Sequence, residues 1–197
     1  NTTSGFSIIK YTGNGTSGHT IPHHLGAVPE WILVKDLDAA VNWQMYHVSL
    51  GNTYTTEINI TNAPFQSSSR WNNTTPSSTV VTLGNGNNVN NNNTNYIMYA
   101  FTSKTGYSKF GSYVGNDNND GTFVYTGFKP AFVIIKKTNE ANDWFLQDNK
   151  RLGYNGANYY LEANTNLVEQ SNSDIDLVSN GFKCRTTGGG HNDGNYI

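Results

Sequence analysis

Charged residues are scarce in this chain, and neither sign dominates. They make up 13% of the sequence, and 12 Lys plus Arg against 14 Asp plus Glu leave a formal net charge of −2. Proteins that bind nucleic acids usually carry a strong basic patch. We therefore expect no nucleic-acid partner. Membrane insertion is not expected either, because no apolar run approaches the roughly 18 residues of a membrane span.

Cysteine is nearly absent. Cys184 is the single cysteine of the chain, so no internal disulfide can form. Apolar and polar residues alternate from 181 to 185, which places Cys184 on the same side of a strand as Phe182. No His or Asp adjoins Cys184 in the sequence to activate its thiol. The pattern predicts a buried packing residue rather than a nucleophile.

Catalytic motifs and helical periodicity are also missing. The sequence contains no G-x-S-x-G elbow, no H-E-x-x-H pair and no phosphate-binding loop. Its carboxylates are scattered, so their spacing nominates no acid/base pair. We expect a protein that is not an enzyme and needs no cofactor. A polysaccharide-degrading activity stays open as a third alternative, because two carboxylates can converge from distant strands.

The abundant residues are those of turns, and the runs between them are those of strands. The chain contains 30 Asn and 20 Gly, two residues that tolerate a positive φ. Between the turn-rich stretches, short runs alternate or are continuously apolar, as β-strands do. These runs predict strands at 6–12, 30–35, 43–48, 79–83, 96–101, 122–126, 131–136, 144–147 and 181–185.

The chain also repeats itself. The segment 29–35 (PEWILVK) is echoed by 130–136 (PAFVIIK), 101 residues later, and three further matches follow at nearly the same offset: 42–43 with 143–144, 11–14 with 113–116, and 95–97 with 195–197. An in-register repeat indicates duplicated structural units. We expect an all-β fold of two related antiparallel β-sandwich halves, jelly-roll-like and packed against each other in tandem, at residues 1–105 and 106–197.

The repeat gives three further expectations. The repeated aromatic residues should be core residues: Trp31, Trp43, Phe132 and Trp144. The Asn-rich tract 85–95 should be an exposed loop. The second half ends at Asn195-Tyr196-Ile197, where the first half continues through 98–101, so we expect the natural chain to continue with another short apolar strand.

Two groups of polar residues suggest metal sites, both weakly. The segment 116–121 (NDNNDG) resembles the start of a calcium loop, with Asn116, Asn118 and Asp120 as candidate ligands. Its twelfth position is Gly127, where a bidentate Glu is wanted, so a hairpin loop is the better interpretation. The histidines at 19, 23, 24 and 47 form the second group, but His23 and His24 are adjacent, and adjacent strand residues point to opposite faces rather than toward one metal ion. Histidines at the surface are therefore the better interpretation.

Four aromatic residues are candidates for glycan contact. Many β-sandwich modules hold sugars by ring stacking and by hydrogen bonds from neighbouring amides. In the loop-rich middle of each half, the candidates are Tyr54, Trp71, Tyr159 and Tyr160. Ordinary packing or subunit contact is the competing interpretation.

The chain resembles a family of marine bacteriophage structural proteins associated with tails and fibres. The segments that carry the resemblance are 5–15 (GFSIIKYTGNG), 24–29 (HLGAVP), 47–51 (HVSLG), 106–113 (GYSKFGSY) and 123–130 (FVYTGFKP). The resemblance spans nearly the whole chain and implies a location on a virion surface or otherwise outside the cell.

The resemblance gives the first functional hypothesis, a tail-fibre, tail or capsid appendage module that presents a surface for host attachment. Its expected partners are further copies of itself, as a trimer in a fibre, other virion proteins and a host surface glycan. The alternative is a secreted or cell-surface carbohydrate-binding β-sandwich module.

Overall fold

The protein is nearly all β, as the sequence predicts. The computed structural model describes residues 1–151, 155, 159–172 and 174–197. Each of the predicted runs coincides with a strand to within two residues at either end. The helices of the described chain are single turns, far too short to cross a membrane.

Contacts divide the chain into two compact units. Unit 1 comprises Asn1–Ile58 and Pro64–Lys104, and unit 2 comprises Asn59–Ala63 and Thr105–Ile197. Unit 2 therefore includes six residues that the sequence-based division assigned to the first half, 59–63 and Thr105. Within unit 2, the carbonyl of Thr61 accepts hydrogen bonds from Lys136 Nζ at 3.2 Å and from the backbone N–H of Asn142 at 2.9 Å.

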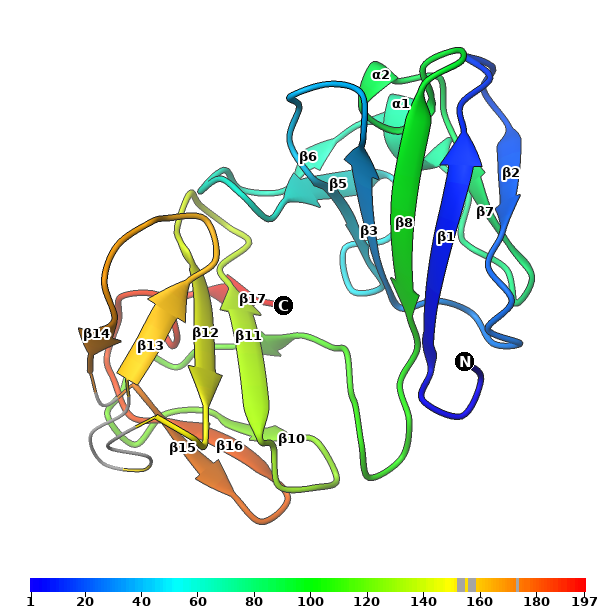
Figure 1. Ribbon diagram of the computed structural model, residues 1–197. Coiled ribbons are helices and arrows are strands. Elements are labelled where there is room, and N and C mark those ends of the chain that lie inside the picture. Colours follow the sequence, from blue (N-terminus) through cyan, green and yellow to red (C-terminus); the bar gives the residue numbers. More distant parts are fainter. Residues whose placement is uncertain (152–154, 156–158, 173) are drawn as a thin grey trace. The chain divides into compact units, whose positions relative to one another are not determined.

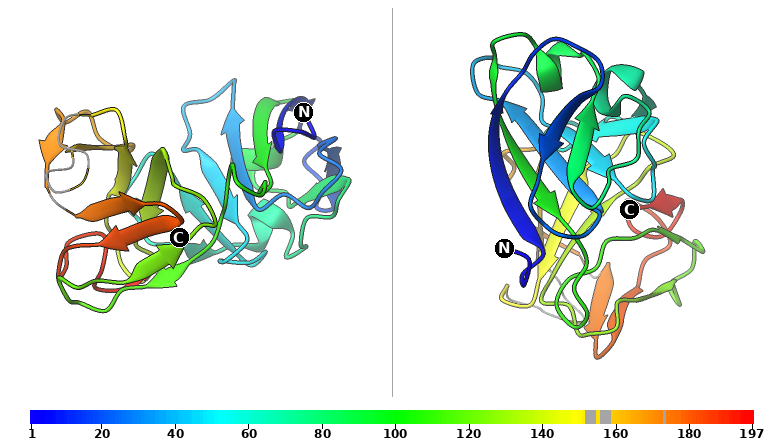
Figure 2. Two further views of the ribbon diagram at one scale, coloured as in Figure 1. Left: turned by 90° about the horizontal axis from the view of Figure 1, so that it is seen from below. Right: turned by 90° about the vertical axis from the view of Figure 1, so that its right-hand side faces the viewer.

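Unit 1 is built around a six-stranded antiparallel sheet of order β1-β8-β3-β4-β5-β6, beside a smaller pair, β2 with β7. The strands β1, β8 and β3 run side by side in Figures 1 and 2. The elements are β1 (Phe6–Thr12), β2 (His19–Pro22), β3 (Trp31–Asp36), β4 (Gln44–His47), β5 (Tyr54–Glu57), β6 (Phe65–Gln66), α1 (Ser68–Trp71), β7 (Val80–Leu83), α2 (Asn87–Asn90) and β8 (Asn95–Phe101).

Alternation along the strands gives unit 1 its core. Every second residue of β8 is buried, from Tyr96 through Met98 to Ala100. The buried side of the sheet meets β2, β7 and the two helical turns. The resulting core cluster contains Tyr11, Ile21, Ile32, Val34, Tyr46, Trp71, Val81, Leu83, Val89, Tyr96 and Met98.

Unit 2 repeats the strand order of unit 1. Its sheets are β11-β12-β13-β14, β10-β16-β15 and β17-β9, and backbone bonds of Lys136 with Ile197, at 2.9 and 3.0 Å, place β17 beside β11. The order β9-β17-β11-β12-β13-β14 thus matches β1-β8-β3-β4-β5-β6. The strands are β9 (Tyr113–Val114), β10 (Phe123–Tyr125), β11 (Phe132–Lys136), β12 (Trp144–Asp148), β13 (Tyr159–Glu162), β14 (Gln170–Ser171), β15 (Ile175–Val178), β16 (Gly181–Cys184) and β17 (Asn195–Tyr196).

Asn90, the last residue of α2, connects separate segments of unit 1. Its side chain is fully buried. Nδ2 donates to the carbonyls of Thr16 at 3.0 Å and Gly84 at 2.8 Å, and Oδ1 accepts from the backbone N–H of Asn14 at 3.0 Å. The amide thereby provides hydrogen-bond partners for backbone groups that lie outside the strands. We call this residue the asparagine tie of unit 1.

Asn192 is the asparagine tie of unit 2. It is also fully buried. Its Nδ2 donates to the carbonyls of Asn118 and Thr186, both at 2.8 Å, and its Oδ1 accepts from the backbone N–H of Asn116 at 3.1 Å. The two ties therefore make equivalent contacts from equivalent places in the chain.

A pair of stacked tyrosines accompanies each tie. The rings of Tyr11 and Tyr96 are 5.2 Å apart, and those of Tyr113 and Tyr196 are 4.8 Å apart. The first tyrosine of each pair donates its hydroxyl to the carbonyl of the residue before the tie, at 2.6 and 2.7 Å. These contacts explain why the sequence motif around Tyr11 recurs around Tyr113.

The predictions of burial for the tract 85–95 and for two histidines are wrong. Val89 and Asn90, inside the tract expected to be an exposed loop, are the buried residues of α2: Val89 belongs to the core cluster and Asn90 forms the tie. His23 and His47 are buried rather than on the surface, and burial lowers the pKa of His47 to about 4.

The repeated aromatic residues are not all core residues. Trp144 is 2% exposed, but Phe132 is 56% exposed, and Trp31 and Trp43 are half-buried. The last two lie on or beside the outward side of their sheet, where Trp31 stacks on Phe101 at 4.9 Å. Cys184 is fully buried, as predicted.

Candidate functional site

A polar hollow in unit 1 is the candidate functional site. It has a volume of about 370 Å³, and its lining residues lie in or next to β5, β6 and α1. Figure 1 labels these three elements in unit 1. Every lining residue is polar and uncharged: Thr53, Gln66, Ser67, Ser68, Ser69 and Asn73. Hydroxyl and amide groups of this kind both donate and accept hydrogen bonds.

Short backbone elements hold the walls of the hollow. The strands β5 and β6 pair with Tyr54 opposite Gln66, and the backbone N–H of Ser67 donates to the carbonyl of Thr53 at 3.0 Å. After α1, Asn72 and Asn73 adopt the left-handed conformation, with φ of 51° and 48°. Asn tolerates this conformation better than most residues, so the chain turns sharply and Asn73 joins the lining.

A buried polar chain fixes the residues at the base of α1. Arg70 Nε donates to Gln44 Oε1 at 2.8 Å, and Gln44 Nε2 donates to Glu57 Oε1 at 2.6 Å. Arg70 Nη1 also donates to the hydroxyl of Ser69 at 3.0 Å. Burial lowers the pKa of the Arg70 guanidinium, and the nearby Glu57 carboxylate opposes that shift. Gln44 thus links the two opposite charges, and neither Arg70 nor Glu57 lines the hollow.

Tyr54 lies beside this hollow, and Trp71 does not reach the surface. The half-buried Tyr54 accepts a hydrogen bond from Gln66 Nε2 at its hydroxyl, at 3.3 Å, and follows Thr53 of the lining. Trp71 is 1% exposed and packs edge-on against Tyr46 at 5.9 Å between ring centres. The prediction of Trp71 as a glycan contact is therefore wrong, because a sugar cannot reach its ring.

Tyr159 and Tyr160 lie in unit 2, on β13. They are consecutive strand residues, so their side chains point to opposite faces. Tyr160 packs against Phe145 at 5.4 Å, and burial, with smaller contributions from Asp174 and other carboxylates, raises its pKa. Tyr160 thus serves packing, and only Tyr159 is left on the outward side.

The candidate calcium loop uses its side-chain oxygens to hold its own backbone. Asn116 Oδ1 accepts from the backbone N–H of Asn118 at 3.2 Å and from Asn192 Nδ2 at 2.8 Å. Asn118 Oδ1 accepts from the backbone N–H of Asp120 at 2.8 Å, and the Asp120 carboxylate pairs with Lys183 at 2.7 Å. These bonds fit a turn tied to Asn192. Among the described residues, no group of three or more His, Cys, Asp or Glu is arranged so that it could hold a metal ion.

Unit 2 also encloses ionisable groups that the sequence did not reveal. Asp174 and His191 are almost fully buried, with 3.6 Å between Asp174 Oδ2 and His191 Nδ1. Burial raises the pKa of Asp174 to about 6 and lowers the pKa of His191 to about 3. Cys184 donates its thiol proton to the His191 carbonyl at 3.3 Å, and burial raises its pKa to about 11. The thiol therefore stays protonated and is a poor nucleophile.

Fold and site together define an all-β protein of two compact units with an uncharged, hydrogen-bonding hollow. The chain belongs to a domain family of unknown function, DUF7483, whose model matches residues 1–197. Neither the curated proteins nor the solved structures contain a match to it.

Proposed function

We propose that this protein is a non-catalytic surface module that attaches to glycans through the hollow of unit 1. The observation that carries the proposal is the lining of that hollow, six uncharged polar residues, of which Gln66 donates a hydrogen bond to the hydroxyl of Tyr54. Sugars present hydroxyl groups and C–H faces, which are bound by such amides and hydroxyls and by an adjacent aromatic ring.

The wider setting in this proposal is a virion. The sequence resemblance to bacteriophage tail and fibre proteins supports a tail-fibre, tail or capsid appendage that presents a surface for host attachment, at the virion surface or outside the cell. Two β-sandwich halves, jelly-roll-like and in tandem, suit this role, because such modules carry binding groups on rigid strands and short loops. Further copies of the chain, as a trimer, and other virion proteins are its proposed partners.

A secreted or cell-surface carbohydrate-binding module is the second candidate. The same hollow favours it, so the two candidates differ in their assembly rather than in their ligand. Immunogold electron microscopy of purified particles with antibodies against this chain separates them. Labelled particles support the virion module, and unlabelled particles with labelled host cells support the secreted module.

Glycan binding itself is tested with the whole chain on an array of neutral and charged bacterial surface glycans. We expect wild type to bind a subset and Tyr54→Ala to bind that subset about tenfold more weakly, since a stacked ring contributes roughly 1–1.5 kcal/mol. Tyr107→Ala is the matched control, because Tyr107 is 70% exposed in unit 2. If the two variants bind glycans equally well, the hollow of unit 1 is not the glycan-binding site.

A further inference from the structure

A second surface of unit 1 combines aromatic, aliphatic and lysine side chains. It is the outward side of β1, β8 and β3, whose inward side, with Tyr96 and Met98, is core. Residues directly opposite each other on neighbouring antiparallel strands share a face. The pairing therefore arranges this outer face in three rows: Phe6, Phe101 and Trp31; Ile8, Tyr99 and Leu33; Lys10, Ile97 and Lys35.

Aromatic rings continue across the outer face. Phe6 stacks on Phe101 at 4.5 Å, Phe101 contacts Trp31 at 4.9 Å, and Phe6 lies 6.2 Å from Tyr99. These rings are half-buried, and Ile8 beside them is 59% exposed. A patch of apolar groups on a sheet face commonly marks a binding surface. Ring faces and edges held by mutual stacking suit the C–H faces of sugars.

The charge on the outer face has one sign. Lys10 and Lys35 are the charged residues among its nine positions, and no carboxylate is among them. Neither lysine forms an ion pair with a carboxylate of the described chain. The two lie on strands separated by β8, which places their backbones about 10 Å apart. This local charge contrasts with the net charge of −2 of the whole chain.

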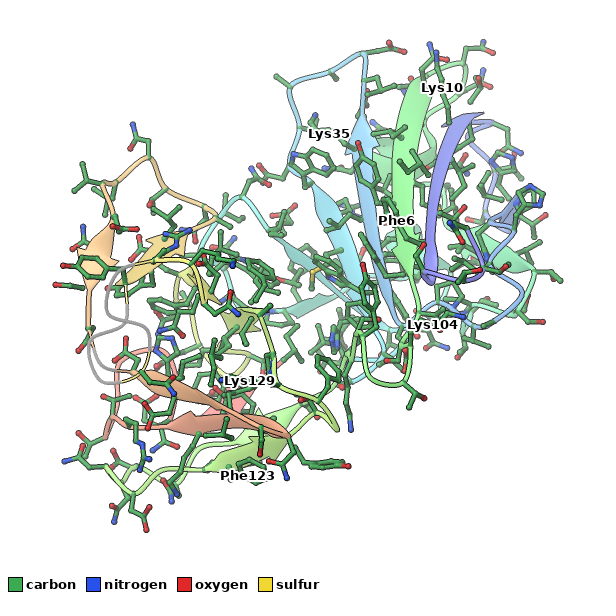
Figure 3. The ribbon with its side chains drawn as sticks, turned by 60° about the horizontal axis from the view of Figure 1, so that its bottom comes forward. Phe6, Lys10, Lys35, Lys104, Phe123 and Lys129 are labelled. Atoms are coloured by element: carbon green, nitrogen blue, oxygen red, sulfur yellow. The ribbon has the colours of Figure 1, made fainter. Side chains whose placement is uncertain are left out.

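Both ammonium groups can bind an anion. Lys10 is exposed. Lys35 Nζ donates to the carbonyls of Asp36 at 2.9 Å and Ala39 at 3.0 Å, and an ammonium has three donors, so one donor remains. Figure 3 labels Phe6, Lys10 and Lys35 on these strands.

We propose that the outer face binds an anionic glycan, a polysaccharide that carries carboxylate or sulfate groups. Sugar rings pack on the side chains of Phe6, Ile8 and Tyr99, and the acidic groups pair with Lys10 and Lys35. The inference rests on the proposed function, because it assigns a second glycan surface to the same attachment module. Nucleic acid is a poorer fit, since binding a phosphate backbone usually takes many more basic contacts than two.

The test uses the whole chain and three probes: sodium alginate, dextran sulfate and neutral dextran. Affinities are measured by isothermal titration calorimetry for wild type, Lys10→Glu and Lys150→Glu. Lys150 is an exposed lysine of unit 2, so the control makes the same change in net charge. Lys35 is left in place because its ammonium holds the turn after β3.

We expect alginate or dextran sulfate to bind wild type and neutral dextran not to bind. Lys10→Glu should weaken the anionic binding about tenfold and Lys150→Glu by less than about twofold, with both effects falling as salt rises. Binding to alginate alone assigns carboxylate as the ligand group, and binding to dextran sulfate alone assigns sulfate.

Three results would overturn the inference: equal binding of neutral and anionic dextrans, equal losses in the two variants, or tighter binding of single-stranded DNA than of either polyanion. Light scattering that shows a wild-type oligomer dissociated by Lys10→Glu would also overturn it, since the outer face would then be a contact between copies. If Tyr54→Ala abolishes glycan binding and Lys10→Glu leaves it unchanged, this inference fails and the proposed function stands.

Discussion

The two units make the same hydrogen bonds around their asparagine ties but enclose different interiors. Asn90 and Asn192 each hold two carbonyls and one backbone N–H, beside a stacked tyrosine pair. The residue before the tie is Val89 in unit 1, within the apolar core, and His191 in unit 2, 3.6 Å from Asp174. The hydrogen-bonded frame is thus shared, while this position exchanges an apolar side chain for an ionisable one.

At a second position the two units carry opposite charges. Asp36 follows β3's lysine and accepts hydrogen bonds from the backbone N–H groups of Asp38 and Ala39, at 2.8 and 2.9 Å. Its repeat counterpart is Lys137, which pairs with Asp193 at 2.8 Å and with Glu140. Asp36 and Lys137 thus hold equivalent turns after their strands, although their own charges are opposite. The two repeats therefore share the geometry of this turn but not the sign of the charge that holds it.

The largest expected difference between the units concerns the repeated tryptophans. Trp144 is buried and its twin Trp43 is half-buried. Trp144→Ala should lower the free energy of unfolding by about 3–5 kcal/mol and Trp43→Ala by about 1–2 kcal/mol, because a buried ring leaves a cavity. Urea denaturation checks this, and equal losses would mean that the burial of the twins does not differ in solution.

The asparagine ties should have the next largest effect, and an equal one in the two units. Asn90→Ala and Asn192→Ala each remove a fully buried amide and its hydrogen bonds to two carbonyls and an N–H, so we expect a loss of about 2–4 kcal/mol for each. Asn92→Ala, two residues from the first tie but exposed, should cost almost nothing. If either substitution lowers the free energy of unfolding as little as Asn92→Ala does in the same denaturation series, the two ties are not equivalent.

The buried Asp174 should give unit 2 a pH dependence of its own. Its pKa of about 6 when folded lies above its usual value, so the stability that it contributes is present at low pH and is lost as pH rises through about 6. Asp174→Asn removes that loss. We therefore expect the variant to gain about 1–2 kcal/mol relative to wild type between pH 4.5 and pH 7.5.

The buried groups that face Asp174 include His191, Cys184 and Tyr160, which are present in both proteins of that comparison. Guanidinium denaturation at the two pH values supplies the measurement. A variant whose advantage is larger at pH 4.5 would show that the carboxylate is ionised and stabilised when folded.

The smallest expected effect is the reactivity of Cys184. The thiol is fully buried and burial raises its pKa to about 11, so iodoacetamide at pH 8 should leave the folded protein unmodified. The denatured protein should gain one label by mass spectrometry. Labelling of the native protein within minutes would mean that the β15–β16 region opens readily.

The strands and the repeat were predictable because their signals are local. Alternation fixes which residues of β8 face inward, and the repeated segment 29–35 marks β3 and its twin β11. Burial of single residues was less predictable. Trp31 and Phe132 lie in strongly apolar runs, yet the sheet places both on its outward side.

The sequence contains no comparable local signal for the asparagine ties or for the hollow. Asn90 stands in a tract of similar asparagines, and its distance to the stacked tyrosine is six residues, against four for Asn192, so a fixed offset does not align them. The hollow is lined by Ser, Thr, Asn and Gln, which are common throughout the chain. Tyr54 was predicted from its ring alone, and the chain turn at Asn72 and Asn73 that completes the hollow depends on tertiary structure.

Competition for host adsorption tests the central claim, attachment through unit 1, most directly. Particles that carry this protein are mixed with host cells in the presence of excess purified chain, and the unadsorbed fraction is counted. The account predicts that wild-type chain and Tyr107→Ala slow adsorption equally, whereas Tyr54→Ala competes about tenfold less well. Adsorption that is unaffected by wild-type chain at saturating concentration would contradict it.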